Sequence, residues 1–224
     1  MWGSPNTSYF NKTFPSAPAF KLGRLRTLFC SLENSDLLTN RRFAQITAAL
    51  SKTDIDESYS DANNKGMKSV FSDQWKHISI LCEPPELGKL KESIARSKPR
   101  IVVIDTTDMI WVKGIHDEIG KMNEIINSLK SIAITQECIV IAVHHVNKEA
   151  MREGISTLTS LKGTTNVVQK ADKVLAINGD INERMRSVHS EKARDEGFMR
   201  MMFKFNNKTF IFEQIEDPEG FANA

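Results

Sequence analysis

The sequence predicts an α/β fold with a mainly parallel sheet, flanked by helices, and an antiparallel hairpin near the C-terminus. Short aliphatic runs alternate with segments of helical periodicity, and the strongest of these runs is Ile101–Ile104. Polar side chains directly follow three of the runs, as expected where the carboxyl ends of parallel strands line a ligand site.

The first 25 residues differ from the rest of the chain. They hold three of the seven prolines, mixed with Ser, Asn and Thr, and show no sustained periodicity. We therefore expect a flexible N-terminal segment over 1–25, an α/β domain over 26–216 and a short tail over 217–224.

The domain is expected to begin with a strand over 27–32. Asn34 or Ser35 is suited to cap the helix that follows, and we place Leu37 and Ile46 on the apolar side of that helix.

The middle of the chain alternates between the two kinds of element. Residues 52–70 are polar, and we predict no strand or helix there. Beyond them we expect strands over 78–82, 101–104 and 139–143, with helices over 86–97 and 117–134. The C-terminal part is expected to hold a strand over 173–177 and a hairpin over 198–205 and 209–214, with its turn at Asn206-Asn207.

Composition excludes several classes of protein. Lys+Arg 30 against Asp+Glu 28 gives a net charge of +2, and 40% of residues are hydrophobic, which excludes a disordered, collagen-like or wholly coiled-coil chain. The small net charge also argues against nucleic-acid binding by bulk charge alone. No apolar stretch approaches the roughly 18 residues that span a bilayer, and there is no signal segment. The widely spaced Cys30, Cys82 and Cys138 look like reduced core residues, so we expect a cytoplasmic protein without membrane contact.

Three polar motifs stand at the ends of predicted strands. Glu33 follows Leu32, Asp105 follows Ile104, and His144-His145 follow Val143. Each alone is most often the start of a loop, but the three would converge on one edge of a parallel sheet. The run Arg100-Ile-Val-Val-Ile-Asp105-Thr106-Thr107 has the form of a Walker B strand, whose carboxylate holds Mg²⁺ beside nucleotide phosphates.

Together these residues resemble the RecA-like ATPase core of hexameric replicative helicases, of the DnaB type or the plasmid RepA type, from about Arg26 to Gln214. The resemblance implies that Glu33 of Ser31-Leu32-Glu33 activates the attacking water. It also implies that Asp105 and Thr106 bind ATP and Mg²⁺, with Asp105 acting through water. His145, or alternatively His144, would sense the γ-phosphate.

The resemblance extends to two segments further along the chain. Lys192-Ala193-Arg194 is similar to a Lys-x-Arg motif that reaches into the neighbouring subunit's nucleotide site, with Arg194 as the arginine finger and Lys192 assisting. Residues 149–166 match a loop that faces the central channel. Lys148, Arg152 and Lys162 are therefore candidate contacts to single-stranded DNA, with solvated loop charge as the alternative.

One element of such a core is missing from the sequence. The phosphate-binding loop G-x-x-x-x-G-K-[ST] is absent: Gly88-Lys89 and Gly120-Lys121 both lack the first glycine and the final Ser or Thr. Two explanations stay open, a fragment lacking its first βα unit or a degenerate paralogue that no longer hydrolyses ATP.

The function we expect is that of an ATP-dependent DNA helicase domain in DNA replication. Its expected partners are single-stranded DNA, further copies of itself in a hexameric ring, and a primase or helicase loader. The alternatives are an inactive DNA-binding or ring-regulating paralogue, and a RecA- or KaiC-like recombinase or regulatory ATPase.

Overall fold

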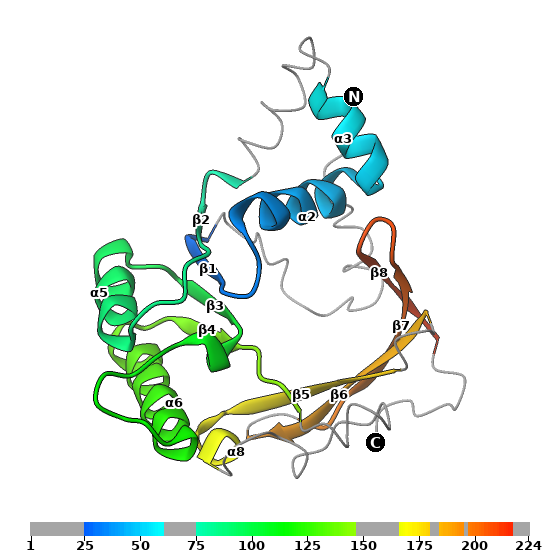
Figure 1. Cartoon of the computed structure of the whole chain (residues 1–224). Helices are drawn as coiled ribbons and strands as arrows, with labels where there is room; N and C mark the ends of the chain where they lie inside the picture. Colours follow the sequence, from blue (N-terminus) through cyan, green and yellow to red (C-terminus); the bar gives the residue numbers. More distant parts are fainter. Residues whose placement is uncertain (1–24, 61–74, 147–165, 180–183, 195–196, 217–224) are drawn as a thin grey trace.

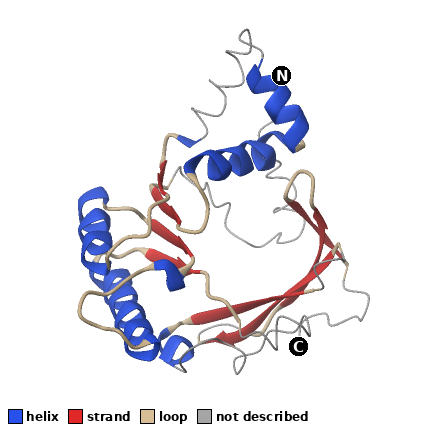
Figure 2. Ribbon diagram, viewed as in Figure 1, coloured by secondary structure: helices blue, strands red, loops and turns tan. Residues whose placement is uncertain are grey.

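A computed structural model describes residues 25–60, 75–146, 166–179, 184–194 and 197–216. Their elements form two sheets with helices packed around the first (Figures 1 and 2). The first sheet is parallel and has the order β2-β1-β3-β4. Its strands are β1 (Thr27–Ser31), β2 (Ile78–Leu81), β3 (Ile101–Asp105) and β4 (Ile139–Ala142). The α/β class and the parallel sheet predicted from the sequence are confirmed.

The helices between these strands begin where the sequence supplies capping side chains. Ser35 caps α2 (Asp36–Ala48) by accepting a hydrogen bond from the Leu38 amide, and Asp117 caps α6 (Glu118–Thr135) by accepting one from the Gly120 amide. The remaining helices of this part are α3 (Lys52–Ser60), α5 (Leu87–Ser97) and the short 3-10 helix η1 (Thr107–Met109).

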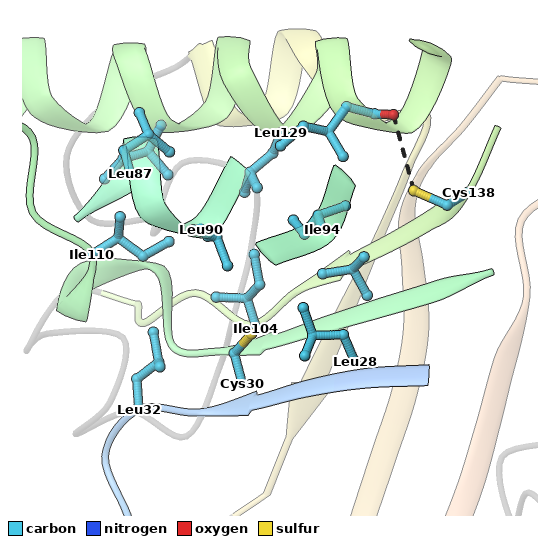
Figure 3. Packing of buried hydrophobic residues seen from close by; sticks show 13 residues of the cluster. Leu28, Cys30, Leu32, Leu87, Leu90, Ile94, Ile104, Ile110, Leu129 and Cys138 are labelled. Atoms are coloured by element: carbon cyan, nitrogen blue, oxygen red, sulfur yellow. Dashed lines mark hydrogen bonds between the residues drawn. The ribbon is translucent and has the colours of Figure 1, made fainter. Parts of the chain in front are cut away.

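The main hydrophobic core lies between one face of the parallel sheet and helices α5 and α6. Figure 3 shows Leu90 and Ile94 of α5 and Leu129 of α6 above Leu28 and Ile104 of the sheet. The amphipathic periodicity of both helices produces this layer, since their apolar residues recur every three or four positions.

The opposite face of the parallel sheet is covered unevenly by the described residues. On β1, Phe29 stacks edge-on against Phe43 of α2, with ring centroids 5.3 Å apart. On β4, by contrast, the alternate side chains Ile139, Ile141 and Val143 are 59%, 49% and 41% exposed. Within the described part of the chain, the helical layer therefore covers one face of β4 and leaves the other open.

The second sheet is antiparallel and has the order β5-β6-β7-β8. It contains β5 (Lys173–Asn178), β6 (Met185–Ala193), β7 (Arg200–Asn206) and β8 (Ile211–Ile215). The short helix α8 (Asn166–Lys170) precedes it and packs against α6. The predicted hairpin is present as β7 and β8, but it belongs to a larger sheet that also includes β5.

Three details of the sequence prediction are wrong. Helix α3 occupies part of the polar stretch over 52–70, because Ser51 and Asp54 cap its start and Ile55 is buried against Ala44. Strand β6 was not predicted, and it extends through residues 185–193. Leu37 and Ile46 of α2 are 71% and 49% exposed, because this helix turns other residues toward the sheet.

The cysteines behave as the sequence indicates. Cys30, Cys82 and Cys138 are all free thiols, and Cys30 and Cys138 are buried. A search of the described helices finds none that is long and apolar enough to span a bilayer.

Candidate ATP site at the carboxyl edge of the parallel sheet

The polar motifs that follow β1, β3 and β4 meet at one edge of the parallel sheet. The three strands are hydrogen-bonded neighbours, and the Leu32 amide donates to the Asp105 carbonyl at 2.6 Å, which joins the ends of β1 and β3. The Val143 amide donates to the Ile104 carbonyl at 2.9 Å and joins the end of β4 to them. Glu33, Asp105 and the histidine pair thus lie together, as the strand order requires.

Glu33 is the centre of a hydrogen-bonded cluster. Its Oε1 lies 2.9 Å from Nε2 of His145 and accepts a hydrogen bond from the Thr106 hydroxyl at 3.1 Å. The hydrogen bond from His145 lowers the pKa of the Glu33 carboxyl, the Thr106 hydroxyl lowers it further, and partial burial opposes both. Since Glu33 and His145 remain 39% and 42% exposed, the ionised carboxylate is accessible to water.

Asp105 lies in a different environment at the end of β3. Partial burial is the main effect that raises the pKa of its carboxyl, and the neighbouring charge of Glu33 adds to it, while Arg42 of α2 acts in the opposite direction. The two carboxylates are therefore tuned apart: Glu33 ionises more readily than a free side chain, and Asp105 less readily.

The donor set at this edge suits Mg²⁺ bound mainly through water and phosphate. Magnesium prefers oxygen ligands and commonly uses one or two carboxylates, completing its shell with water and substrate oxygens. Asp105 supplies the carboxylate and Thr106 a hydroxyl. Among the described residues there is no cluster of three or more His, Cys, Asp or Glu side chains that would form a cage around a metal ion.

The two histidines have separate surroundings. The His144 side chain is only 6% exposed; its Nδ1 lies 2.9 Å from the Thr107 hydroxyl and 3.5 Å from an Asp108 carboxylate oxygen. Thr107 is fully buried, and its amide donates to the Val143 carbonyl at 3.2 Å, which holds the segment after β3 against the end of β4. His145 contacts the catalytic candidate Glu33, whereas His144 braces the loop beneath it.

The sequence reasoning did not include Thr107 and Asp108. Their position directly after Asp105 and Thr106 was the available signal, since residues that follow a strand at this edge are the ones that contact a ligand or its support.

Helix α2 attaches to the site through buried hydroxyls. The Thr39 hydroxyl donates to the Ser31 hydroxyl at 2.9 Å, and both residues are buried. This bond holds α2 against the last residue of β1 and keeps Arg42 within electrostatic range of Asp105. The adjacent Arg41 instead pairs with Asp56 of α3 at 3.1 Å.

Lys192 and Arg194 lie at a different place on the same chain. The Lys192 ammonium donates to the carbonyls of Val168 and Gln169 in α8, and the Arg194 guanidinium contacts Gln169 and Asp172. Asp172 also binds Lys130 of α6, which lowers the pKa of the Asp172 carboxyl. The structure therefore does not bring the Lys-x-Arg motif together with Glu33 and Asp105 of its own chain. Of the candidate DNA contacts, Lys148, Arg152 and Lys162 all lie outside the described residues.

Comparison with known proteins defines the class of this chain. A family model described as an AAA domain matches residues 12–151, and the chain belongs to that family. The match begins within the N-terminal segment over 1–25 and includes Glu33, Asp105 and both histidines.

Solved structures identify the fold more closely. A separately solved ATPase domain superposes with a TM-score of 0.76 at 16% identity, over 95% of this chain and 82% of that one. A DnaB-like replicative helicase, whose structure was determined together with its interactions with primase, superposes with a TM-score of 0.73 at 17% identity. That match covers 85% of this chain and 50% of the helicase chain. The fold is the RecA-like core of replicative helicases; comparison with curated proteins gives no match.

Proposed function

We propose that this chain is the ATPase domain of a hexameric replicative DNA helicase and couples ATP hydrolysis to movement along single-stranded DNA. The observation that carries the proposal is the cluster of Glu33, Thr106 and His145 beside Asp105 at the carboxyl edge of the parallel sheet. The RecA-like fold and the AAA-domain family support it.

Glu33 is the group that orients and deprotonates the attacking water. A general base must be ionised and accessible, and the lowered pKa and partial exposure of Glu33 meet both conditions. The hydrogen bond from His145 holds the carboxylate in one orientation. His145 is thus placed to link the state of the γ-phosphate to Glu33, with His144 as the alternative sensor.

Asp105 and Thr106 would hold Mg²⁺ and the ATP phosphates. When bound, the ion supplies positive charge that neutralises the phosphate oxygens. Burial keeps Asp105 in a shielded position, and the Thr106 hydroxyl ties the segment after β3 to Glu33.

Arg194 would act on the neighbouring subunit of a ring, with Lys192 assisting. In its own chain the Arg194 side chain is 49% exposed and contacts the Asp172 carboxylate and the Gln169 carbonyl, so it can be recruited by a neighbour's phosphates. Lys148, Arg152 and Lys162 would contact DNA phosphates in the channel. A primase or a loader is the partner expected for such a ring.

The missing phosphate-binding loop is explained best by a fragment. An unused site would have no reason to hold Glu33 ionised beside His145 and Thr106, and this arrangement is intact. An inactive DNA-binding or ring-regulating paralogue is the competing reading, favoured by the absence of G-x-x-x-x-G-K-[ST] from the sequence.

The test is ATP hydrolysis with and without single-stranded DNA, by the chain alone and by a version fused to a βα unit that carries the loop. We expect no hydrolysis by the chain alone and DNA-stimulated hydrolysis by the fusion. In the fusion, Glu33→Gln should keep ATP binding and lower the rate by about 10² to 10⁴ fold, whereas Glu118→Gln, an exposed carboxylate on α6, should leave it unchanged.

Mixed rings test the role of Arg194. Arg194→Ala subunits should lose hydrolysis, and mixing them with Glu33→Gln subunits should restore part of it, because each lesion then falls in a different site. A ring without complementation would refute the action in trans. A fusion that binds but never hydrolyses ATP would favour the inactive paralogue, and filament formation without unwinding would favour a RecA- or KaiC-like protein.

A further inference from the structure

The two sheets end on strands whose outer edges have no strand partner within the part of the chain that the structure describes. β4 pairs only with β3 at the end of the parallel sheet, and β5 pairs only with β6 at the end of the antiparallel sheet. An unpaired edge presents a row of amide and carbonyl groups that can hydrogen-bond to another strand.

The outward-facing amides of β4 can be identified. Ile139 and Val143 donate to the carbonyls of Arg100 and Ile104, in β3 and just before it. Because amides along a strand point alternately to its two sides, Val140 and Ala142 direct theirs to the open edge.

The two open edges border the same region of the molecule. Helix α6 leads into β4, and the Cys138 thiol just before that strand contacts the Ile132 carbonyl of α6. On the same helix Lys130 binds Asp172, the residue just before β5. The starts of β4 and β5 are therefore both held by the last part of α6 (Figure 1).

Both edge strands also carry apolar side chains that nothing in the described part covers. On β4 these are Ile139, Ile141 and Val143, and on β5 they are Leu175 and Ile177, which are 49% and 61% exposed. An apolar row on an unpaired edge is a recognised association surface, since native edges are usually protected by charge, proline or a covering element.

We infer that β4 and β5 form a slot for one strand of another polypeptide, and that this strand leads into a glycine-rich phosphate-binding loop and an amphipathic helix. This inference rests on the proposed function. A strand parallel to β4 in the slot would end at the edge where Glu33, Asp105 and His145 lie. Its loop would bring backbone amides, a helix N-terminus and a lysine to these two carboxylates, and its helix would cover Ile141.

Charge and sequence favour an occupant from outside this chain. The described edge holds the acidic Glu33 and Asp105, which a lysine-bearing loop complements. No part of the 224 residues contains G-x-x-x-x-G-K-[ST], so the chain itself does not supply that loop. Residues 1–24 include Pro5, Pro15 and Pro18, and proline is unsuited to a central strand.

The first experiment measures residue-resolved amide exchange in the full chain. The Val140 and Ala142 amides should exchange much faster than those of Ile139, Ile141 and Val143. Slow exchange at Val140 and Ala142 in the chain alone would overturn the inference. If that protection disappears on deletion of residues 1–24, the occupant is the chain's own N-terminal segment, and if it rises with protein concentration, the occupant is a second copy.

The second experiment adds a designed peptide with about five Val and Ile residues, then G-x-x-x-x-G-K-T, then an amphipathic helix. Binding should slow exchange at Val140 and Ala142 by at least tenfold, and the same peptide with proline in its strand should have no effect. Ile141→Lys and, separately, Leu175→Lys should each weaken binding at least tenfold. Ile134→Lys, on an exposed position of α6, should not. No protection by the peptide overturns the inference.

A nucleotide-binding measurement on the same samples separates this inference from the proposed function. Protection of β4 without binding of a fluorescent ATP analogue supports the slot and contradicts the ATPase proposal. Hydrolysis by the unmodified chain without the peptide supports the ATPase proposal and overturns the slot.

Discussion

The two faces of the parallel sheet should differ sharply in their contribution to stability. Ile104 on β3 is fully buried beneath α5 and α6, whereas Ile141 on the neighbouring β4 lies on the open face and is 49% exposed. The same substitution, Ile to Ala, therefore probes both faces within one sheet, and the change in strand propensity is common to the two variants.

The expected magnitudes follow from burial. Ile104→Ala removes buried carbons worth about 0.8 kcal/mol each and leaves a cavity in the core, for a loss of about 3 to 4 kcal/mol. At Ile141 about half of that transfer energy is already absent and solvent fills the space, so the loss should be about 1 kcal/mol.

The assay is equilibrium unfolding in urea of the full chain and both variants at about pH 7.5. With an m-value of about 3 kcal/mol/M, Ile104→Ala should lower the midpoint by about 1 M and Ile141→Ala by about 0.3 M, with m unchanged. Equal losses would mean that the face of Ile141 is as well packed as the helical face, and would refute the open slot. A loss below about 1 kcal/mol at Ile104 would refute the position of the core.

Further predictions concern the titratable groups. His145→Ala should raise the pKa of Glu33 toward its ordinary value, because the hydrogen bond from His145 is the main cause that lowers it; carboxyl chemical shifts followed against pH measure this, and an unchanged pKa contradicts the contact. The stability contributed by Glu33 is present above its unfolded pKa and is lost as pH falls through the lower folded value, so wild type should lose its advantage over this variant in acid. Asp105→Asn should stabilise the fold near neutral pH, since burial raises the pKa of Asp105 and the ionised form is disfavoured; the gain should shrink as pH falls toward that pKa, and urea midpoints that stay parallel across pH would contradict it. Burial raises the pKa of Cys30 to about 12, so a thiol reagent in mildly alkaline buffer should modify the half-buried Cys82 first and reach Cys30 only on unfolding; equal rates would show that Cys30 is accessible.

Much of the first sheet could be predicted from the sequence. Its strands are continuous aliphatic runs of the kind that parallel sheets use, and such runs are visible without any knowledge of contacts. The long amphipathic helices α5 and α6 are equally visible, because their apolar positions recur at helical spacing.

The elements that were not predicted are those whose stability comes from distant contacts. β6 has polar and charged residues along its length and is only partly buried, so it lacks an apolar signature; its pairing with both β5 and β7 creates it. α3 is short and polar and depends on Ile55 packing against Ala44. The exposure of Leu37 and Ile46 likewise depends on how α2 is rotated against the sheet, which its own sequence does not determine.

For the candidate site, the order of residues along the chain already specifies which side-chain types lie at the carboxyl edge, because a polar residue after a buried strand must emerge there. Which of the two histidines contacts Glu33, and which one braces Thr107, depends on the folded arrangement. So does the fall in the pKa of Glu33 and the rise in the pKa of Asp105. The physical reason is separation along the chain: Glu33 and His145 are 112 residues apart, and hydrogen bonds, burial and charge act only over the few ångströms that folding brings them within.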